Sequence, residues 1–134
     1  MPTPTITPAL RYADGPAAIE FLCRAFGFEK HLVVPGEGNT IMHAQLTLGH
    51  GMIMLSSTPS EFDQLVQKPG QAGSVCICVV IQEVDAHCAQ ARAAGAEILQ
   101  EPTDKPYGGR DYVCRDPEGY VWCFGSYDPW ASDA

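Results

Sequence analysis

The sequence has few basic residues: eight lysines and arginines stand against sixteen aspartates and glutamates in 134 residues, a formal net charge of −8. A nucleic-acid partner requires clustered cations to neutralise phosphates, so this composition argues against one. Long hydrophobic runs are also missing, and no basic segment precedes an apolar one at the start of the sequence. We therefore expect a cytoplasmic protein with no membrane partner. Its acidic surface favours solubility or attracts a cationic small molecule.

The sequence also lacks any Cys-x-x-Cys pair, although it contains six cysteines. This absence argues against a zinc ribbon and against a thioredoxin-type redox motif. Four of the cysteines lie in segments with strand character and two in segments with helical spacing: Cys76, Cys78, Cys114 and Cys123, and Cys23 and Cys88. Cytosolic thiols stay reduced, and a buried free cysteine behaves as a small apolar residue. We expect reduced thiols and no disulfide framework.

The first part of the chain predicts a β-α-β-β-β order. Residues 5–12 favour a short strand broken by Pro8, and Asp14 is a predicted N-cap for a helix that ends at Gly27. Three further strands are predicted over residues 28–34, 43–48 and 52–56.

The second part repeats this order after a predicted linker over residues 57–73, which are rich in proline, glycine and polar side chains. A strand is predicted over 75–81, then a helix capped by Asp85 and ended by Gly95. Strands over 96–101, 111–115 and 120–124 complete the second part. The expected fold class is α+β, with one β-α-β-β-β module over residues 1–56 and another over 74–134 in one compact domain.

A shift of 68 positions, half the chain length, superimposes the two modules. It pairs Gly27 with Gly95, and it pairs Gly51 with Gly119. The same shift places Leu55 opposite Cys123. A single shift that matches both a helix end and a hairpin glycine indicates an internal duplication.

The last hairpin carries the most specific pattern. Residues 116–119, Asp-Pro-Glu-Gly, have the chemistry of a type I turn between two segments of strong β character. Alternation places Tyr120, Trp122 and Phe124 on one face of the final strand, and Val121 and Cys123 on the other.

Paired β-α-β-β-β modules that close on Arg-Asp-Pro-Glu-Gly-Tyr-Val-Trp resemble the vicinal oxygen chelate superfamily of glyoxalases, bleomycin-resistance proteins and extradiol dioxygenases. The resemblance covers nearly the whole chain and is strongest to the PhnB-like, bleomycin-resistance-type branch. It implies two curved sheets around a cleft, often completed by a second subunit, so a homodimer is expected. Enzymes of the superfamily hold a divalent metal in that cleft with His, Gln or Glu side chains.

The resemblance also implies where such metal ligands would stand in this sequence. The final-strand glutamate falls on Cys123, and its counterpart in the first module on Leu55. The first-strand ligands fall on Cys76 in the second module and on Thr7 or Pro8 in the first. None of these residues is a carboxylate or an imidazole. Two thiolates could hold a soft ion such as zinc, but water would have to complete the coordination.

Other residues are candidates for lining the cleft. His43 alternates onto a polar face with Gln45, either as an acid or base in the cleft or as a hydrogen-bonded strand residue. In the glycine loop before the last hairpin, Tyr107 and Arg110 could close over a ligand, or Arg110 could pair with one of the many acids. Trp130 lies beyond the last strand, where it could reach a pocket or a partner. His87 is expected on a solvated helix face.

The function predicted from these residues is metal-independent binding of a small molecule, in the manner of the family's antibiotic-resistance proteins, with an aromatic or cationic ligand. No cofactor, metal or catalytic residue is predicted. The competing hypothesis is a metal-dependent lyase or dioxygenase of the same superfamily that uses His43. The predicted ligand-contacting residues are His43, Gln45, Leu55, Cys76, Cys78, Tyr107, Arg110, Val121, Cys123 and Trp130.

Overall fold

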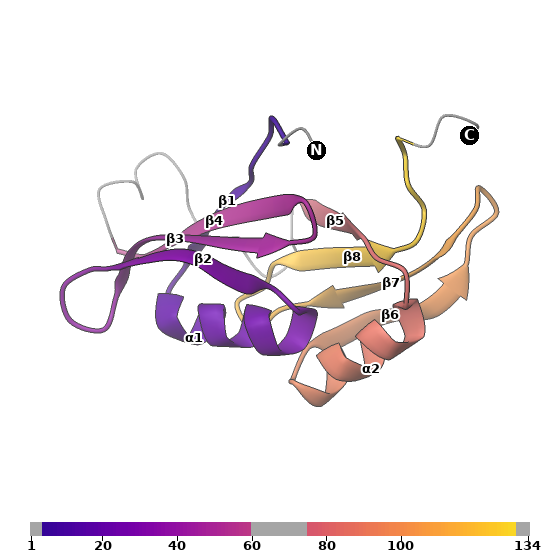
Figure 1. The fold of residues 1–134 in the computed structure, drawn as a ribbon. Coiled ribbons are helices and arrows are strands. Elements are labelled where there is room, and N and C mark those ends of the chain that lie inside the picture. The colour runs from indigo at the N-terminus through magenta and orange to yellow at the C-terminus, as the bar shows by residue number, and fades with distance from the viewer. Residues whose placement is uncertain (1–3, 60–74, 131–134) are drawn as a thin grey trace. The chain divides into compact units, whose positions relative to one another are not determined.

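The computed structural model describes residues 4–59 and 75–130, which form two compact units, one before and one after residues 60–74 in the sequence (Figure 1). Most of the predicted linker, residues 60–73, lies outside the described residues, as do residues 1–3, 74 and 131–134 of the predicted modules. None of the helices formed by the described residues has the length and apolar character needed to cross a bilayer.

The first unit is a four-stranded mixed sheet with one helical segment, as predicted. Its strands lie in the order β1-β4-β3-β2, with β1 parallel to β4 and the other pairs antiparallel. The helix packs against β1 and β4, and Figure 1 shows it along one face of the sheet. The elements are β1 (Ala9–Tyr12), α1 (Gly15–Phe21), η1 (Leu22–Phe26), β2 (Glu29–Pro35), β3 (Ile41–Leu48) and β4 (Gly51–Ser57).

The second unit has the same topology. Its sheet order is β5-β8-β7-β6, with β5 parallel to β8, and α2 packs against β6 and β7. The elements are β5 (Cys76–Val80), α2 (Val84–Ala93), β6 (Glu97–Asp104), β7 (Arg110–Arg115) and β8 (Val121–Gly125). The α+β class and the two β-α-β-β-β modules are thus confirmed.

The two helices begin differently. Asp14 caps α1 as predicted, because its carboxylate accepts the backbone N–H of Ala17 at 3.0 Å. The predicted cap of α2, Asp85, is wrong: the N-cap is Glu83, which makes no side-chain cap bond, and Asp85 lies in the first helical turn. A carboxylate in the first turn stabilises a helix through its interaction with the helix dipole, so acidic residues are common both at the N-cap and just after it. This similarity led to the assignment of Asp85 as the cap.

Each helix covers the apolar face of its own sheet. In the second unit Trp122 and Phe124 are fully buried, with rings stacked at 5.9 Å. The α2 residue His87 is not solvated as predicted: its ring lies 4.3 Å from that of Phe124, and its Nδ1 is 2.6 Å from the Tyr112 hydroxyl. The hydrogen bond with His87 satisfies the buried Tyr112 hydroxyl, which would bond to water if it were exposed.

The final hairpin is organised by one carboxylate. Asp116 is 3% exposed, and its Oδ1 accepts the backbone N–H groups of Glu118 and Tyr120 at 3.0 and 3.1 Å. Its Oδ2 accepts the indole N–H of Trp122 at 3.1 Å. The turn predicted at 116–119 is confirmed by the bond from Gly119 N–H to the Asp116 carbonyl. The same residue therefore ties the turn to the aromatic core.

The two modules do not superimpose at one constant shift. The N-caps Asp14 and Glu83 lie 69 positions apart, whereas the helix-ending glycines Gly27 and Gly95, both with positive φ, lie 68 apart. The first helix ends in a π-helical turn, η1, and this turn holds the additional residue. Single-residue insertions into helices commonly take this form.

The turn between β3 and β4 is one residue shorter than the turn between β7 and β8, so β4 and β8 are again related by a shift of 69 positions. Two residues separate the paired Leu48 and Gly51, whereas three separate Asp116 from Tyr120, whose carbonyl accepts the Asp116 N–H. The predicted equivalence of Leu55 and Cys123 is therefore off by one residue. The counterpart of Cys123 is Met54, since Met54 pairs with Ala9 as Cys123 pairs with Cys78. In a strand, an error of one residue exchanges the two faces.

Candidate functional site

Each sheet has an open face, opposite the face that its helix covers. In the second unit the register places Cys78, Cys123 and Val113 side by side on β5, β8 and β7. Their neighbours in sequence, such as Trp122, Tyr112 and Cys114, point into the core. The open face of the second unit includes Cys76, Cys78, Asp111, Val113, Arg115, Val121 and Cys123.

Two thiols on this open face, Cys76 and Cys123, are held in the neutral form. Desolvation raises the pKa of Cys76 to about 11, with further increases from neighbouring Cys78 and from the Asp111 carboxylate. Desolvation and then the Asp111 carboxylate raise the pKa of Cys123 to about 12. A protonated thiol is a poor nucleophile and a poor metal ligand but a polarisable apolar contact. Apart from the charged side chains of Asp111 and Arg115, this face therefore presents soft sulfur atoms and valine methyl groups.

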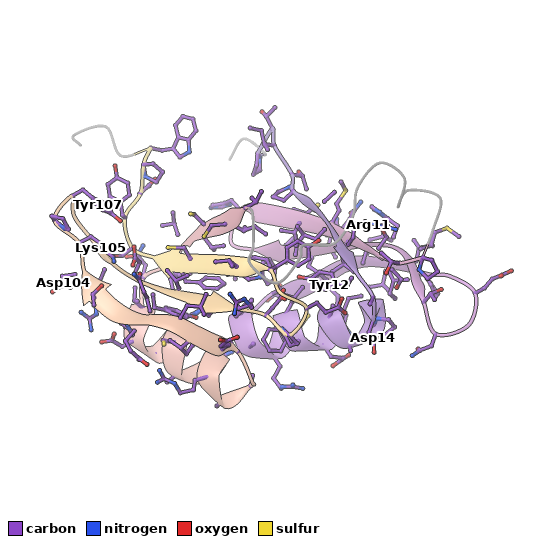
Figure 2. The ribbon with its side chains drawn as sticks, turned by 180° about the vertical axis from the view of Figure 1, so that it is seen from behind. Arg11, Tyr12, Asp14, Asp104, Lys105 and Tyr107 are labelled. Atoms are coloured by element: carbon purple, nitrogen blue, oxygen red, sulfur yellow. The ribbon has the colours of Figure 1, made fainter. Side chains whose placement is uncertain are left out.

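One ion pair borders the thiols. Lys105 Nζ lies 3.2 Å from Asp111 Oδ1, with side chains 21% and 13% exposed. Figure 2 shows Lys105 on the hairpin between β6 and β7, close to Asp104 and Tyr107. The Tyr107 hydroxyl is 3.5 Å from Asp111 Oδ2, so the hairpin and the open face meet at this carboxylate.

Arg110 and the aromatic residues near it are less suited to ligand contact than the sequence suggested. The Arg110 guanidinium donates to Asp85 at 3.0 Å and to Asp104 at 3.2 Å, which supports its predicted pairing with acids. The ring of Tyr107 is 61% exposed and packs edge-on against that of Tyr127 at 5.1 Å. Trp130 is 91% exposed.

The first unit has an open face of different character. Across β3 and β4 it presents Gln45 beside Met54. His43 follows on the same face of β3, and Ser56 of β4 pairs with Arg11 of β1. His43 Nε2 lies 3.0 Å from the Gln45 amide nitrogen, so the structure favours the hydrogen-bonded strand residue over a free acid or base.

A pocket of about 630 Å³ opens at one end of this sheet. Its wall comes from β1, β3, β4 and the connection between β2 and β3, and includes Arg11, Thr40, Met42, His43, Met54 and Ser56. Leu55 borders the pocket but does not lie on the open face: it is 2% exposed and pairs with core residues Leu10 and Ala44. Thr7 and Pro8 precede β1, and both are partly buried.

Comparison with known proteins identifies the fold. The model of the Glyoxalase/Bleomycin resistance protein/Dioxygenase superfamily matches residues 6–124. The chain belongs to this superfamily. TioX from Micromonospora sp. ML1 is 35% identical, with a TM-score of 0.73 over 90% of this chain and 95% of that one. An uncharacterised protein of Mycobacterium tuberculosis strain H37Rv is 30% identical over 91% of this chain and 74% of its own length.

A structural likeness to lactoylglutathione lyase from Agrobacterium tumefaciens supports the glyoxalase fold alone, since the identity is 23%. Its TM-score is 0.65, over 92% of this chain and 93% of that one.

The residues at the positions where the family resemblance places metal ligands do not fit a hard divalent ion. Corrected for the structural repeat, these positions hold Cys76 and Cys123 in the second unit and Thr7 and Met54 in the first. Thiols with raised pKa values, a hydroxyl and a thioether are poor ligands for a hard divalent ion. Within residues 4–59 and 75–130, no three or more His, Cys, Asp or Glu side chains are arranged to hold a metal ion.

The structure thus groups some of the predicted site residues and separates others. Cys76, Cys78, Val121 and Cys123 share one open face, and His43 and Gln45 share the other. Five residues that border the open faces or the pocket were not predicted from the sequence: Arg11, Met54, Ser56, Lys105 and Asp111. The alternation of Met52, Met54 and Ser56 was a signal for two of them, but nothing in the sequence indicates that Arg11 faces a pocket.

Proposed function

We propose that this member of the glyoxalase and bleomycin-resistance superfamily binds and sequesters a small molecule without a metal ion. The observation that supports the proposal most directly is that two thiols, Cys76 and Cys123, lie on the open face of β5 and β8 where the family resemblance places a histidine and a glutamate. Desolvation raises the pKa of both thiols, which disfavours the thiolate form. The row of Cys78, Cys123 and Val113 presents sulfur atoms and methyl groups, which pack well against an apolar ring.

The ligand class follows from the same face. Sulfur atoms contact aromatic rings favourably, by about 0.3–1.5 kcal/mol for each pair. The side chains of Cys78, Val113 and Cys123 lie in one row across three strands, which suits a planar aromatic group. A cationic substituent on such a ligand would be attracted by the net charge of −8. We further propose that the protein acts as a homodimer in the cytoplasm, with the ligand as its partner and no cofactor.

The metal-independent proposal predicts little metal in the purified protein. Protein purified without chelators should contain well below one equivalent of nickel, zinc or manganese by mass spectrometry, because no suitable donor set meets among the described residues. Calorimetric titration with each ion should give no saturable heat. Stoichiometric metal that is lost in His43→Ala would contradict the proposal and favour the lyase or dioxygenase hypothesis.

Ligand binding itself can be tested with a panel of planar aromatic and glycopeptide compounds, followed by thermal unfolding. At least one compound should raise Tm saturably, and Cys78→Arg should abolish that rise because the new side chain occupies the open face. Ala86→Arg is the matched control, since Ala86 is exposed on α2, which covers the opposite face of the same sheet. Absence of any saturable response, or equal loss in both variants, would overturn the proposed site.

A further inference from the structure

One carboxylate lies next to the row of Cys78, Cys123 and Val113 on the open face of the second unit. Asp111 precedes Val113 by two residues on β7, so it lies on the same face, about 7 Å along the strand. Its partner on β8 is Gly125, just as Cys123 is the partner of Val113. The row therefore ends at an acidic group on one side.

The glycine lets this carboxylate lean over β8. A Cβ atom at Gly125 would lie only 2.6 Å from the Cβ atom of Asp111. Directly opposed residues on neighbouring strands usually keep their Cβ atoms about 4.5–5.5 Å apart, so Asp111 occupies space that a side chain at position 125 would fill. Its charge consequently reaches the thiols, since it contributes to the raised pKa of both Cys76 and Cys123.

The Asp111 carboxylate is incompletely hydrogen-bonded. Lys105 Nζ approaches Oδ1 at 3.2 Å, but this buried oxygen makes no hydrogen bond with any of the described residues. Within the same part of the chain, Oδ2 has one contact, the Tyr107 hydroxyl at 3.5 Å, which is beyond the usual hydrogen-bond distance. A carboxylate offers about four acceptor positions. Since Oδ1 is buried and the side chain is 13% exposed, Oδ2 is the oxygen that a ligand can reach.

The Lys105 ammonium does not close this position permanently. Lys105 comes from the hairpin between β6 and β7 rather than from the sheet (Figure 2), and its side chain is 21% exposed. An ammonium on a flexible four-carbon stem pairs as a point charge, and a partly exposed ion pair contributes little to stability. A second cation can therefore share or replace this contact.

We propose that Asp111 is the anchor for a protonated nitrogen of the ligand, whose planar aromatic part lies on the row of Cys78, Cys123 and Val113. An ammonium or amidinium group supplies the N–H donors that the carboxylate lacks, and hydrogen bonds between two charged groups are the strong ones. The spacing of about 7 Å is within reach of an amine one methylene group away from a ring. The inference deepens the proposed function and rests on it, because it names the charged group of the ligand and the residue that binds it.

The test uses two matched probes, 2-naphthylmethylamine, which is protonated at neutral pH, and its neutral analogue 2-naphthylmethanol. By calorimetric titration the full-length protein should bind the amine roughly tenfold or more tightly than the alcohol, as expected for hydrogen bonds between charged groups. Asp111→Asn should remove this preference and leave the alcohol unaffected. Asp85→Asn removes the same charge from a 69% exposed side chain on α2, which covers the opposite face, and should retain the preference. Equal affinity of the two probes for the wild-type protein would overturn the inference.

A lysine variant should give a change of the opposite sign. Lys105→Gln removes the cation that competes for Asp111, so it should strengthen binding of the amine several-fold and leave the alcohol unchanged. Lys30→Gln is the matched control, because it changes the net charge equally at an exposed site in the first unit. If both lysine variants strengthened amine binding alike, the net charge would attract the amine and Asp111 would not be its anchor.

Protection from alkylation locates the bound amine without any substitution. Saturating 2-naphthylmethylamine should slow the reaction of Cys78 and Cys123 with iodoacetamide several-fold, because the ring covers both thiols. Cys23, in the first unit, should react at an unchanged rate. Peptide mass spectrometry measures the three rates. Unchanged rates at Cys78 and Cys123 would refute the anchor even if Asp111→Asn fails to fold.

The two proposals fail in different ways. If only the anchor is wrong, amine and alcohol bind with equal affinity and both protect Cys78 and Cys123. If the proposed open-face site is itself wrong, neither probe protects these thiols, and no compound of the panel raises Tm in a manner that Cys78→Arg abolishes.

Discussion

Asp116→Ala should lower the free energy of unfolding of the second unit by at least about 3 kcal/mol. Asp116 is 3% exposed and accepts three N–H groups, from Glu118, Tyr120 and the indole of Trp122. Alanine would leave these donors without their acceptor in a place that water reaches poorly. Each unsatisfied buried donor costs about 1–3 kcal/mol. Chemical denaturation followed by circular dichroism measures the change.

Two further variants sharpen this prediction. Asp116→Asn should have an intermediate effect, because its oxygen can keep both backbone bonds while its NH2 group opposes the indole N–H. Asp128→Ala is the matched control, since that carboxylate accepts only the exposed backbone N–H of Trp130 among the bonds found here. The expected change is below about 1 kcal/mol. Equal stability of Asp116→Ala and Asp128→Ala would show that the hairpin does not depend on this carboxylate.

Cys76 and Cys123 should react with iodoacetamide about ten- to a hundredfold more slowly than a free thiol at pH 8. Desolvation raises their pKa values to about 11 and about 12, so only a very small fraction is thiolate at that pH. The greater intrinsic nucleophilicity of a high-pKa thiolate offsets part of this loss. The rates should rise close to tenfold per pH unit up to pH 10, as measured by peptide mass spectrometry with glutathione as the reference thiol.

Asp111 provides a variant that tests the cause. Its carboxylate contributes to the raised pKa of both thiols, so Asp111→Asn should accelerate alkylation of Cys76 and Cys123. Cys23, in the first unit, serves as an internal control whose rate should not change. A plateau in the alkylation rate of Cys76 or Cys123 near pH 9 would show that these thiols ionise normally. Such a result would weaken the proposal that the open face of the second unit binds its ligand without a metal ion.

Local chemistry in the sequence predicted much of the fold. Asp14 was predicted as a helix cap because a short side chain with an acceptor is favoured before the first helical turn. Residues 116–119 were predicted as a turn because a type I turn favours those residue types. The helix-ending glycines have positive φ for the same kind of local reason. Each of these features depends on a few adjacent residues, which a sequence displays directly.

The candidate site depends on register, which the sequence shows less well. Leu55 was placed on the open face because the count ignored the third residue in the turn before Tyr120. Met54 holds that position instead. Arg11 lies beside Ser56 only because β1 and β4 align in one register, and no local pattern predicts such a meeting. Pairing between distant strands is decided by tertiary packing.

The parallel pairing of first and last strands also has a consequence for synthesis on the ribosome. Within each unit β1 or β5 hydrogen-bonds to the strand that is made last, β4 or β8, so neither sheet is complete until its whole module has emerged. The first module can complete its sheet once residue 57 has left the exit tunnel, while the second is still being translated. Until β8 emerges, β5 exposes an unpaired edge of thiols and valines, and this interval is when the nascent chain is most prone to aggregation.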